Sequence, residues 1–152
     1  VKENTDTASG VTDSVTTRTE DPAVAVFGDA ITGGAEVIMV SSAYYSQIDG
    51  SAPAVFSPTI VTDMLRTEMG FTGVVITDDV AAAVQVQDWA AGERAVKAVS
   101  AGCDIVLASA DPSVAADMAT ALVSAAQSDP ALAARIDESA RRVMALKGAK
   151  QA

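Results

Sequence analysis

Residues 73–80 read GVVITDDV, and this stretch decides the fold that the sequence predicts. A glycine precedes four apolar or β-branched residues, and two aspartates, Asp78 and Asp79, follow them directly. A short apolar run bounded in this way is typical of a buried β-strand. Such a strand fixes the backbone of the aspartates, while the loop beyond it leaves their side chains accessible. We therefore expect chemistry at the end of this strand.

Two further apolar runs, EVIMVS at 36–41 and CDIVLA at 103–108, predict two more strands. Caps, prolines and closing glycines predict helices before, between and after the strands, at 22–34, 59–70, 81–86, 89–102, 112–127 and 130–147. Strands alternating with helices indicate parallel βαβ units. All three strands then point the same way. Ser41, Ser42, Asp78 and Ser109 would emerge on one edge, where α/β folds build their active sites.

The chain divides into three parts by its sequence pattern. Residues 1–21 lack apolar periodicity and predict an irregular segment on the active face; residues 22–148 carry the strand and helix pattern, and 149–152 form a tail. The basic stretch ARRVMALKGAK at 140–150 is most simply a solvated helix end. The expected fold class is α/β, with too few strands to close a barrel.

Composition excludes several classes of function. Twenty acidic and ten basic side chains give a formal charge of −10, which would repel a nucleic acid backbone. No run is long and apolar enough for a membrane span. The single Cys103 lies in an apolar run and has no second cysteine for a disulfide or a zinc cluster. No histidine is present, so the commonest general base and metal ligand is missing. We expect no metal and no cofactor.

The first residue, Val1, is not an initiator methionine. We expect the chain to have been processed or cut from a longer one, so that a targeting segment upstream is not excluded. The compartment is therefore left open among the cell envelope, the medium and the cytoplasm.

The aspartate pair has three interpretations from pattern alone. In the first, one aspartate caps the helix expected at 81–86, because aspartate is among the best N-cap residues. In the second, an aspartate is catalytic, and the pattern favours the two about equally. Both roles fit if Asp79 caps and Asp78 reacts. The third interpretation is a receiver-like phosphoacceptor or Mg²⁺ pocket, which paired aspartates also form. A phosphoacceptor pocket of this kind requires a lysine at the end of a later strand, and ASADPS at 108–113 contains none.

The phrase LRTEMGFTGVVITDD at 65–79 resembles the N-terminal barrel domain of glycoside hydrolase family 3, which includes bacterial β-N-acetylglucosaminidases and β-glucosidases. The resemblance is collinear over 36–80 and 92–109 and implies strands six to eight of a TIM-type (β/α)8 barrel. The chain would then be the C-terminal part of that barrel. We expect another chain to complete it, most simply the N-terminal half of the same precursor, or less simply a second copy.

The same resemblance implies roles for individual residues. Asp78 corresponds to the nucleophile of a retaining β-glycosidase, which attacks the anomeric carbon of a β-linked glucoside or N-acetylglucosaminide. In the acetylglucosaminidases an Asp-x-His pair supplies the acid. The corresponding stretch here, NTDTASG at 4–10, offers Asp6 but has Ala8 where the histidine would stand.

Three more residues are candidates for contacts with the carbohydrate substrate. Ser41 and Ser42 stand where the family often has Ser-His, and Tyr44 lies on the following active-face loop. Tyr44, Tyr45 and Trp89 suit stacking on a sugar ring, although packing at the barrel rim is the commoner use of such aromatics. The implied function is a retaining β-glycosidase that is inactive as this isolated chain. The alternative is a sugar-binding relative without catalysis, because the acid dyad is broken.

Overall fold

The computed structural model describes residues 9–18 and 20–149. In chain order its elements are β1 (Thr12–Asp13), α1 (Pro22–Thr32), β2 (Val37–Val40), β3 (Tyr44–Tyr45), η2 (Ala54–Phe56), η3 (Thr59–Glu68), β4 (Val74–Asp79), η4 (Val84–Val86), α2 (Ala91–Ala101), β5 (Ile105–Leu107), η5 (Pro112–Val114), α3 (Ala115–Ser128) and α4 (Pro130–Ala149). Three of them, η2, η4 and η5, are single 3₁₀ turns, whereas η3 is a helix with i→i+5 hydrogen bonds.

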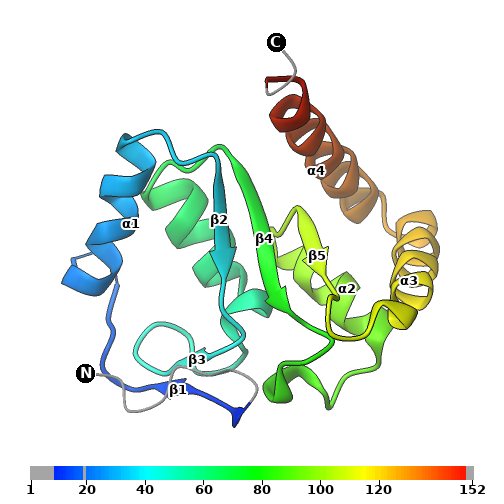
Figure 1. Ribbon diagram of the computed structural model, residues 1–152, viewed down its shortest axis with the longest axis horizontal. Helices are drawn as coiled ribbons and strands as arrows, with labels where there is room; N and C mark the ends of the chain where they lie inside the picture. Colours follow the sequence, from blue (N-terminus) through cyan, green and yellow to red (C-terminus); the bar gives the residue numbers. More distant parts are fainter. Residues whose placement is uncertain (1–8, 19, 150–152) are drawn as a thin grey trace.

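The central sheet has the strand order β2-β4-β5, and both pairs of strands are parallel. Ile38 pairs with Val75, and Ile76 pairs with Ile105. Each strand lies within one of the predicted apolar runs, and helices connect the strands (Figure 1). The prediction of parallel strands alternating with helices in an α/β fold is confirmed.

Only one face of β2 belongs to the hydrophobic core. Ile38 and Val40 are buried in a cluster that η2, η3 and α2 also build. Figure 1 shows η3 and α2 behind the sheet. The alternate residues Val37 and Met39 remain 43% and 54% exposed. Parallel sheets normally have both faces covered, so the described part of the chain leaves one face of β2 open.

Helix boundaries follow capping residues. Asp21 caps α1 by accepting the N–H of Ala23, and Gly33 ends the helix. The Ser57 hydroxyl accepts the N–H of Ile60 at 3.2 Å at the start of η3. Gly70 follows η3 with φ +70°, a conformation that favours glycine. The predicted ends at Gly33, Ser57 and Gly70 are confirmed because caps and closing glycines are local signals, whereas the Asp21 cap was not predicted.

The segment before α1, expected to be irregular, contains the short strand β1. It pairs in parallel with β3, with Thr12 opposite Tyr44 and Asp13 opposite Tyr45. Gln85 adds a second attachment: its side chain accepts the N–H of Val11 at 2.9 Å and donates to the carbonyl of Val11. The loop after β4 therefore holds this N-terminal segment against β3.

The helix expected at 81–86 is absent, and only its end forms the 3₁₀ turn η4. The side-chain amide of Gln87 donates to the backbone carbonyls of Val80, Ala81 and Ala83. Side-chain donors of this kind offer the backbone an alternative to helical hydrogen bonds. The expectation of a helix was wrong because alanine content alone favoured it.

Asp104, just before β5, anchors the C-terminal helix to the sheet. Its side chain is 0% exposed. The donors around its carboxylate are Arg66 Nη2 (2.6 Å), Val75 N (2.9 Å), Arg135 Nη2 (2.7 Å), Ser139 Oγ (3.0 Å) and Arg142 Nη1 (3.3 Å). Burial by itself would raise the pKa of Asp104, but these hydrogen bonds and the arginine charges bring the pKa below its ordinary value.

The basic stretch at 140–150 was therefore only partly predicted. Arg142 turns inward to Asp104 and keeps 21% of its side chain exposed, instead of lying in solvent. Within the described residues, no helix combines the length and the apolar character that crossing a membrane requires.

Gly102, between α2 and β5, is expected to tolerate no side chain. Its φ is +120°, and a Cβ there would lie 2.6 Å from Thr62 Oγ1. We expect Gly102→Ala to lower the free energy of unfolding by about 1–3 kcal/mol, because backbone strain and a steric clash coincide. Urea denaturation measures this. Gly148→Ala on α4 is the matched control, since its Cβ meets nothing within 4 Å and should be neutral or stabilising. Equal stabilities of the two variants would contradict the prediction.

Candidate active site

Asp78 and Asp79 occupy the last two positions of β4, the strand in the middle of the sheet. Val74 and Val75 are almost completely buried and hold the strand in place. The strand ends between β2 and β5, so its terminal carboxylates lie close to the loops that follow both neighbours. The sequence prediction placed both aspartates at this edge, and the hydrogen bonds described next agree with it.

Both carboxylate oxygens of Asp78 accept backbone N–H groups. Oδ2 accepts the N–H of Ser42, beyond the end of β2, at 3.3 Å. Oδ1 accepts the N–H of Asp79 at 2.8 Å. The carboxyl group is half-buried. These two backbone donors orient the carboxylate, and an oriented carboxylate can act as a nucleophile.

Asp79 makes a different set of contacts. Its carboxylate accepts hydrogen bonds from Ala81 in the turn after β4 and from Ser109 and Ala110 in the loop after β5. Partial burial opposes ionisation, yet these hydrogen bonds hold the pKa of Asp79 below its ordinary value. It was expected to cap a helix, and instead it caps a turn and binds a second loop.

The three candidate substrate-binding residues lie on or beside this edge. Ser41 is half-buried, and its hydroxyl accepts the N–H of Ala43 at 2.9 Å. Ser42 is 0% exposed, and its hydroxyl has no hydrogen-bond partner in the described part of the chain. Tyr44 lies on β3, where its N–H donates to the carbonyl of Val11. Of the three, Ser42 is the one with a hydrogen bond to Asp78, which its backbone N–H donates.

The candidate acid, Asp6, and its neighbour Ala8 lie outside the described residues. The described residues begin at Ser9, directly after Ala8. Two residues further on, Val11 hydrogen-bonds to the side chain of Gln85. Sequence reasoning missed Gln85, because a single glutamine in an alanine-rich loop carries no signal of a contact with a residue 74 positions away.

Trp89 is partly buried and packs against the edge of the hydrophobic core. Its ring contacts Phe56 edge-on, with centroids 5.4 Å apart, and Lys97 Nζ lies 5.5 Å from the centroid. A cation over the ring occupies the surface that a sugar would stack on. Tyr45 lines a cavity together with residues of α1 and η3. These positions agree with rim packing, the commoner use of such aromatics.

Among the described residues, no group of three or more His, Cys, Asp or Glu is placed to hold a metal ion. Cys103 is fully buried, and burial raises the pKa of its thiol to about 12. The arrangement at the strand end therefore offers carboxylate chemistry, with one oriented and half-exposed group, Asp78.

Comparison with known proteins identifies the family. The description "Glycosyl hydrolase family 3 N terminal domain" matches residues 2–146. The chain belongs to glycosyl hydrolase family 3. A crystal structure of a β-N-acetylhexosaminidase from Beutenbergia cavernae is similar at 56% identity with a TM-score of 0.89, covering 91% of this chain and 41% of that chain.

Other family 3 proteins give the same picture. A β-N-acetylglucosaminidase structure from Paenibacillus sp. has 29% identity and a TM-score of 0.81, covering 95% of this chain and 28% of that chain. An uncharacterized secreted glycosyl hydrolase of Arthroderma benhamiae is 35% identical over 119 residues, 78% of this chain and 34% of its own length. A β-hexosaminidase of Stenotrophomonas maltophilia is 38% identical over 81 residues, 53% of this chain and 24% of its own. The chain thus spans about a third or less of these two curated relatives.

Proposed function

We propose that this chain carries the nucleophile of a retaining β-glycosidase that hydrolyses β-linked N-acetylglucosaminides or glucosides. The observation that carries the proposal is Asp78, oriented by two backbone N–H groups at the end of the central strand. Relatives named β-hexosaminidase and β-N-acetylhexosaminidase support this substrate class. Membership of family 3 does not favour the receiver-like Mg²⁺ alternative.

The proposed reaction has two steps. One oxygen of Asp78 attacks the anomeric carbon, the bond from that carbon to the leaving oxygen breaks, and an acid gives the leaving oxygen a proton. This forms a glycosyl ester of Asp78. Water then attacks the anomeric carbon, loses a proton to the same group acting as base, and releases the sugar and the Asp78 carboxylate.

Asp6 is proposed as the acid and base of these steps. No histidine is present to assist it, and Ala8 stands at the position of the expected partner. Ser41, Ser42 and Tyr44 are proposed around the substrate on the same edge. Ser42 is fully buried, and its backbone N–H donates to Asp78. Its proposed role is therefore to orient the nucleophile and not to contact the sugar directly.

We further propose that β2, β4 and β5 are strands six to eight of a (β/α)8 barrel. Within the described residues, β2 and β5 each have one free edge, and exposed edges invite pairing with further strands. The open face of β2, with Val37 and Met39, would face the barrel interior. These features support a larger fold than the described strands form.

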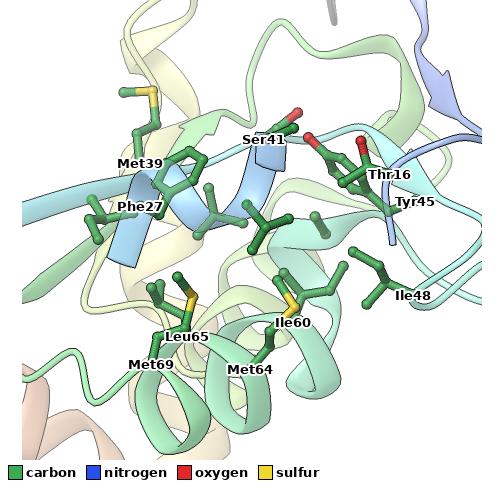
Figure 2. Close-up of a pocket in the computed structure, with 15 residues that line it drawn as sticks. Thr16, Phe27, Met39, Ser41, Tyr45, Ile48, Ile60, Met64, Leu65 and Met69 are labelled. Atoms are coloured by element: carbon green, nitrogen blue, oxygen red, sulfur yellow. The ribbon is translucent and has the colours of Figure 1, made fainter. Parts of the chain in front are cut away.

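A cavity of about 210 Å³ lies between α1, β2 and η3. Figure 2 shows apolar side chains around it, among them Phe27, Met39, Met64, Leu65 and Met69. Asp78 is not among its lining residues, although Ser41, beyond the end of β2, is one of them. We propose that apolar residues of the partner polypeptide fill it.

The partner proposed for this chain is a polypeptide that carries the N-terminal half of the same barrel, and the combination is called the assembled enzyme below. Pairing of two copies is the second arrangement. Size-exclusion chromatography with mass analysis, followed by an assay on aryl N-acetyl-β-glucosaminides, tests both. We expect a complex of the two polypeptides with turnover, and none from the chain alone. A well-folded monomer of 15.4 kDa would contradict the proposal of a partner.

A sugar-binding relative without catalysis is the second candidate function. The absence of histidine from the whole sequence, and Ala8 in the acid stretch, favour it. Measurable binding of cell-wall sugars by the assembled enzyme, with no turnover of aryl glycosides, would support this candidate over the first.

A further inference from the structure

The side chain of Asp79 joins the loops after two different strands. Its Oδ2 accepts three hydrogen bonds from the loop after β5: Ser109 N–H at 3.1 Å, the Ser109 hydroxyl at 2.5 Å and Ala110 N–H at 2.7 Å. Its Oδ1 accepts the N–H of Ala81 at 2.9 Å. One carboxylate therefore fixes the ends of β4 and β5 relative to each other.

The backbone of the same residue contacts the proposed nucleophile. The N–H of Asp79 donates to Oδ1 of Asp78 at 2.8 Å. One residue further on, the N–H of Val80 donates to the carbonyl of Leu107 at 3.0 Å and ties the same backbone to β5. The direction of the N–H that orients Asp78 thus depends on contacts on both sides of Asp79.

We propose that Asp79 is a positioning residue for Asp78 and that it stays ionised throughout the reaction, so that it is not the proton donor. The inference rests on the proposed role of Asp78 as the nucleophile. It also addresses a question that the sequence leaves open, because a neighbouring carboxyl group is an obvious substitute for the missing Asp-His acid.

The chemistry of the contacts supports both halves of the proposal. Three donors point at Oδ2, and a proton on that oxygen would be repelled by their hydrogens. A proton on Oδ1 would be opposed in the same way by the N–H of Ala81. Hydrogen bonds to the charged form of a carboxyl group favour ionisation. A general acid must instead hold its proton near the working pH.

The first test measures ionisation directly and needs no turnover. The side-chain carboxyl of Asp79 is followed by ¹³C-detected NMR during a pH titration of the assembled enzyme. We expect a midpoint below the ordinary aspartate value of about 3.9. A midpoint at or above about pH 5, as a proton donor requires, would overturn the assignment.

The second test is kinetic and uses Asp79→Asn in the assembled enzyme. We expect kcat/KM to fall about 10²-fold, to a similar extent for dinitrophenyl and nitrophenyl glycosides, because a misplaced nucleophile slows attack whatever the leaving group. Loss of an acid would leave kcat/KM for the dinitrophenyl glycoside nearly unchanged, because dinitrophenolate is a good leaving group without protonation. That pattern would overturn the proposal.

Counting active sites separates positioning from simple loss of folded protein. With a slow 2-fluoro-glycoside, we expect Asp79→Asn to be labelled at every site but more slowly than wild type. Fewer sites labelled at the wild-type rate would show a purely structural role and contradict the proposal. Absence of turnover in the wild type would instead count against the proposed function, and the NMR titration would still decide the ionisation of Asp79.

Asp111→Asn is the matched control for these measurements. Asp111 also accepts hydrogen bonds from a following serine, the N–H of Ser113 at 3.1 Å and its hydroxyl at 2.5 Å, and it lies in the same loop after β5. Both of these hydrogen bonds stay within the loop after β5. We expect wild-type kinetics from it, while Ser109→Ala, which removes one bond to Asp79, should show a partial loss of rate.

Discussion

Replacing Asp104 with alanine is expected to lower the free energy of unfolding by about 3–5 kcal/mol, the usual effect of removing one partner from a buried ion cluster. Three arginines, Arg66, Arg135 and Arg142, surround this carboxylate with side chains only 12%, 17% and 21% exposed. Without Asp104 their charges would repel one another in a partly dry environment. Such a loss is a large part of the stability of a typical domain, about 5–15 kcal/mol.

Urea denaturation of the assembled enzyme measures this effect. Glu68→Ala is the matched control, because it removes a carboxylate from the ion pair with Arg18, whose side chains are 38% and 46% exposed. An exposed pair of this kind contributes at most about 1 kcal/mol. If Asp104→Ala and Glu68→Ala cost the same, the cluster does not hold α4 as described.

Acid should weaken the same cluster. The pKa of Asp104 is below its ordinary value in the folded protein, so its contribution is present above the unfolded value of about 3.9 and is lost as pH falls through the lower folded pKa. The wild type should therefore lose stability below about pH 4 more steeply than Asp104→Asn does. Parallel stability curves over this pH range would contradict that expectation.

Replacing Asp78 with alanine is expected to reduce turnover by the assembled enzyme on the order of 10⁴-fold, because the covalent intermediate has no other nucleophile to form on. The effect on folding should be smaller than that of Asp104→Ala, since Asp78 is only half-buried whereas the Asp104 side chain is fully buried. The measurement is kcat/KM on an aryl N-acetyl-β-glucosaminide, with the melting temperature recorded beside it.

Two additions make the Asp78 experiment specific. Asp88→Asn removes an exposed carboxylate from the loop after β4 and should keep wild-type turnover. Added azide should restore part of the activity of Asp78→Ala by attacking the anomeric carbon in place of the carboxylate, which a purely structural defect would not allow. Unchanged turnover in Asp78→Ala would show that the nucleophile is another residue.

The sheet could be predicted because its signals are local. Each of the strands β2, β4 and β5 coincides with an apolar run bounded by polar or glycine residues, and parallel order follows from the helices between them. The position of Asp78 and Ser42 on one edge followed from that order. The family phrase at 65–79 favoured one of the roles that the pattern alone left open for Asp78, and that role stays a prediction.

Contacts between distant residues could not be predicted. Asp104 gathers Arg66 from 38 positions before it and Arg142 from 38 positions after it. The basic stretch therefore looked like a solvated helix end, because a helix pattern does not say what the helix packs on. β1 was missed because two residues carry no strand period, and the helix at 81–86 was wrong because Gln87 competes for its carbonyls.

Trapping the glycosyl intermediate tests the central proposal most directly. The assembled enzyme is incubated with a 2-fluoro-glycoside that has a good leaving group, then digested with a protease, and the labelled peptide is sequenced by mass spectrometry. We predict one label per enzyme, carried by Asp78. A label on Asp79 or on any other residue would contradict the assignment of the nucleophile, and turnover without any covalent label would contradict the retaining mechanism.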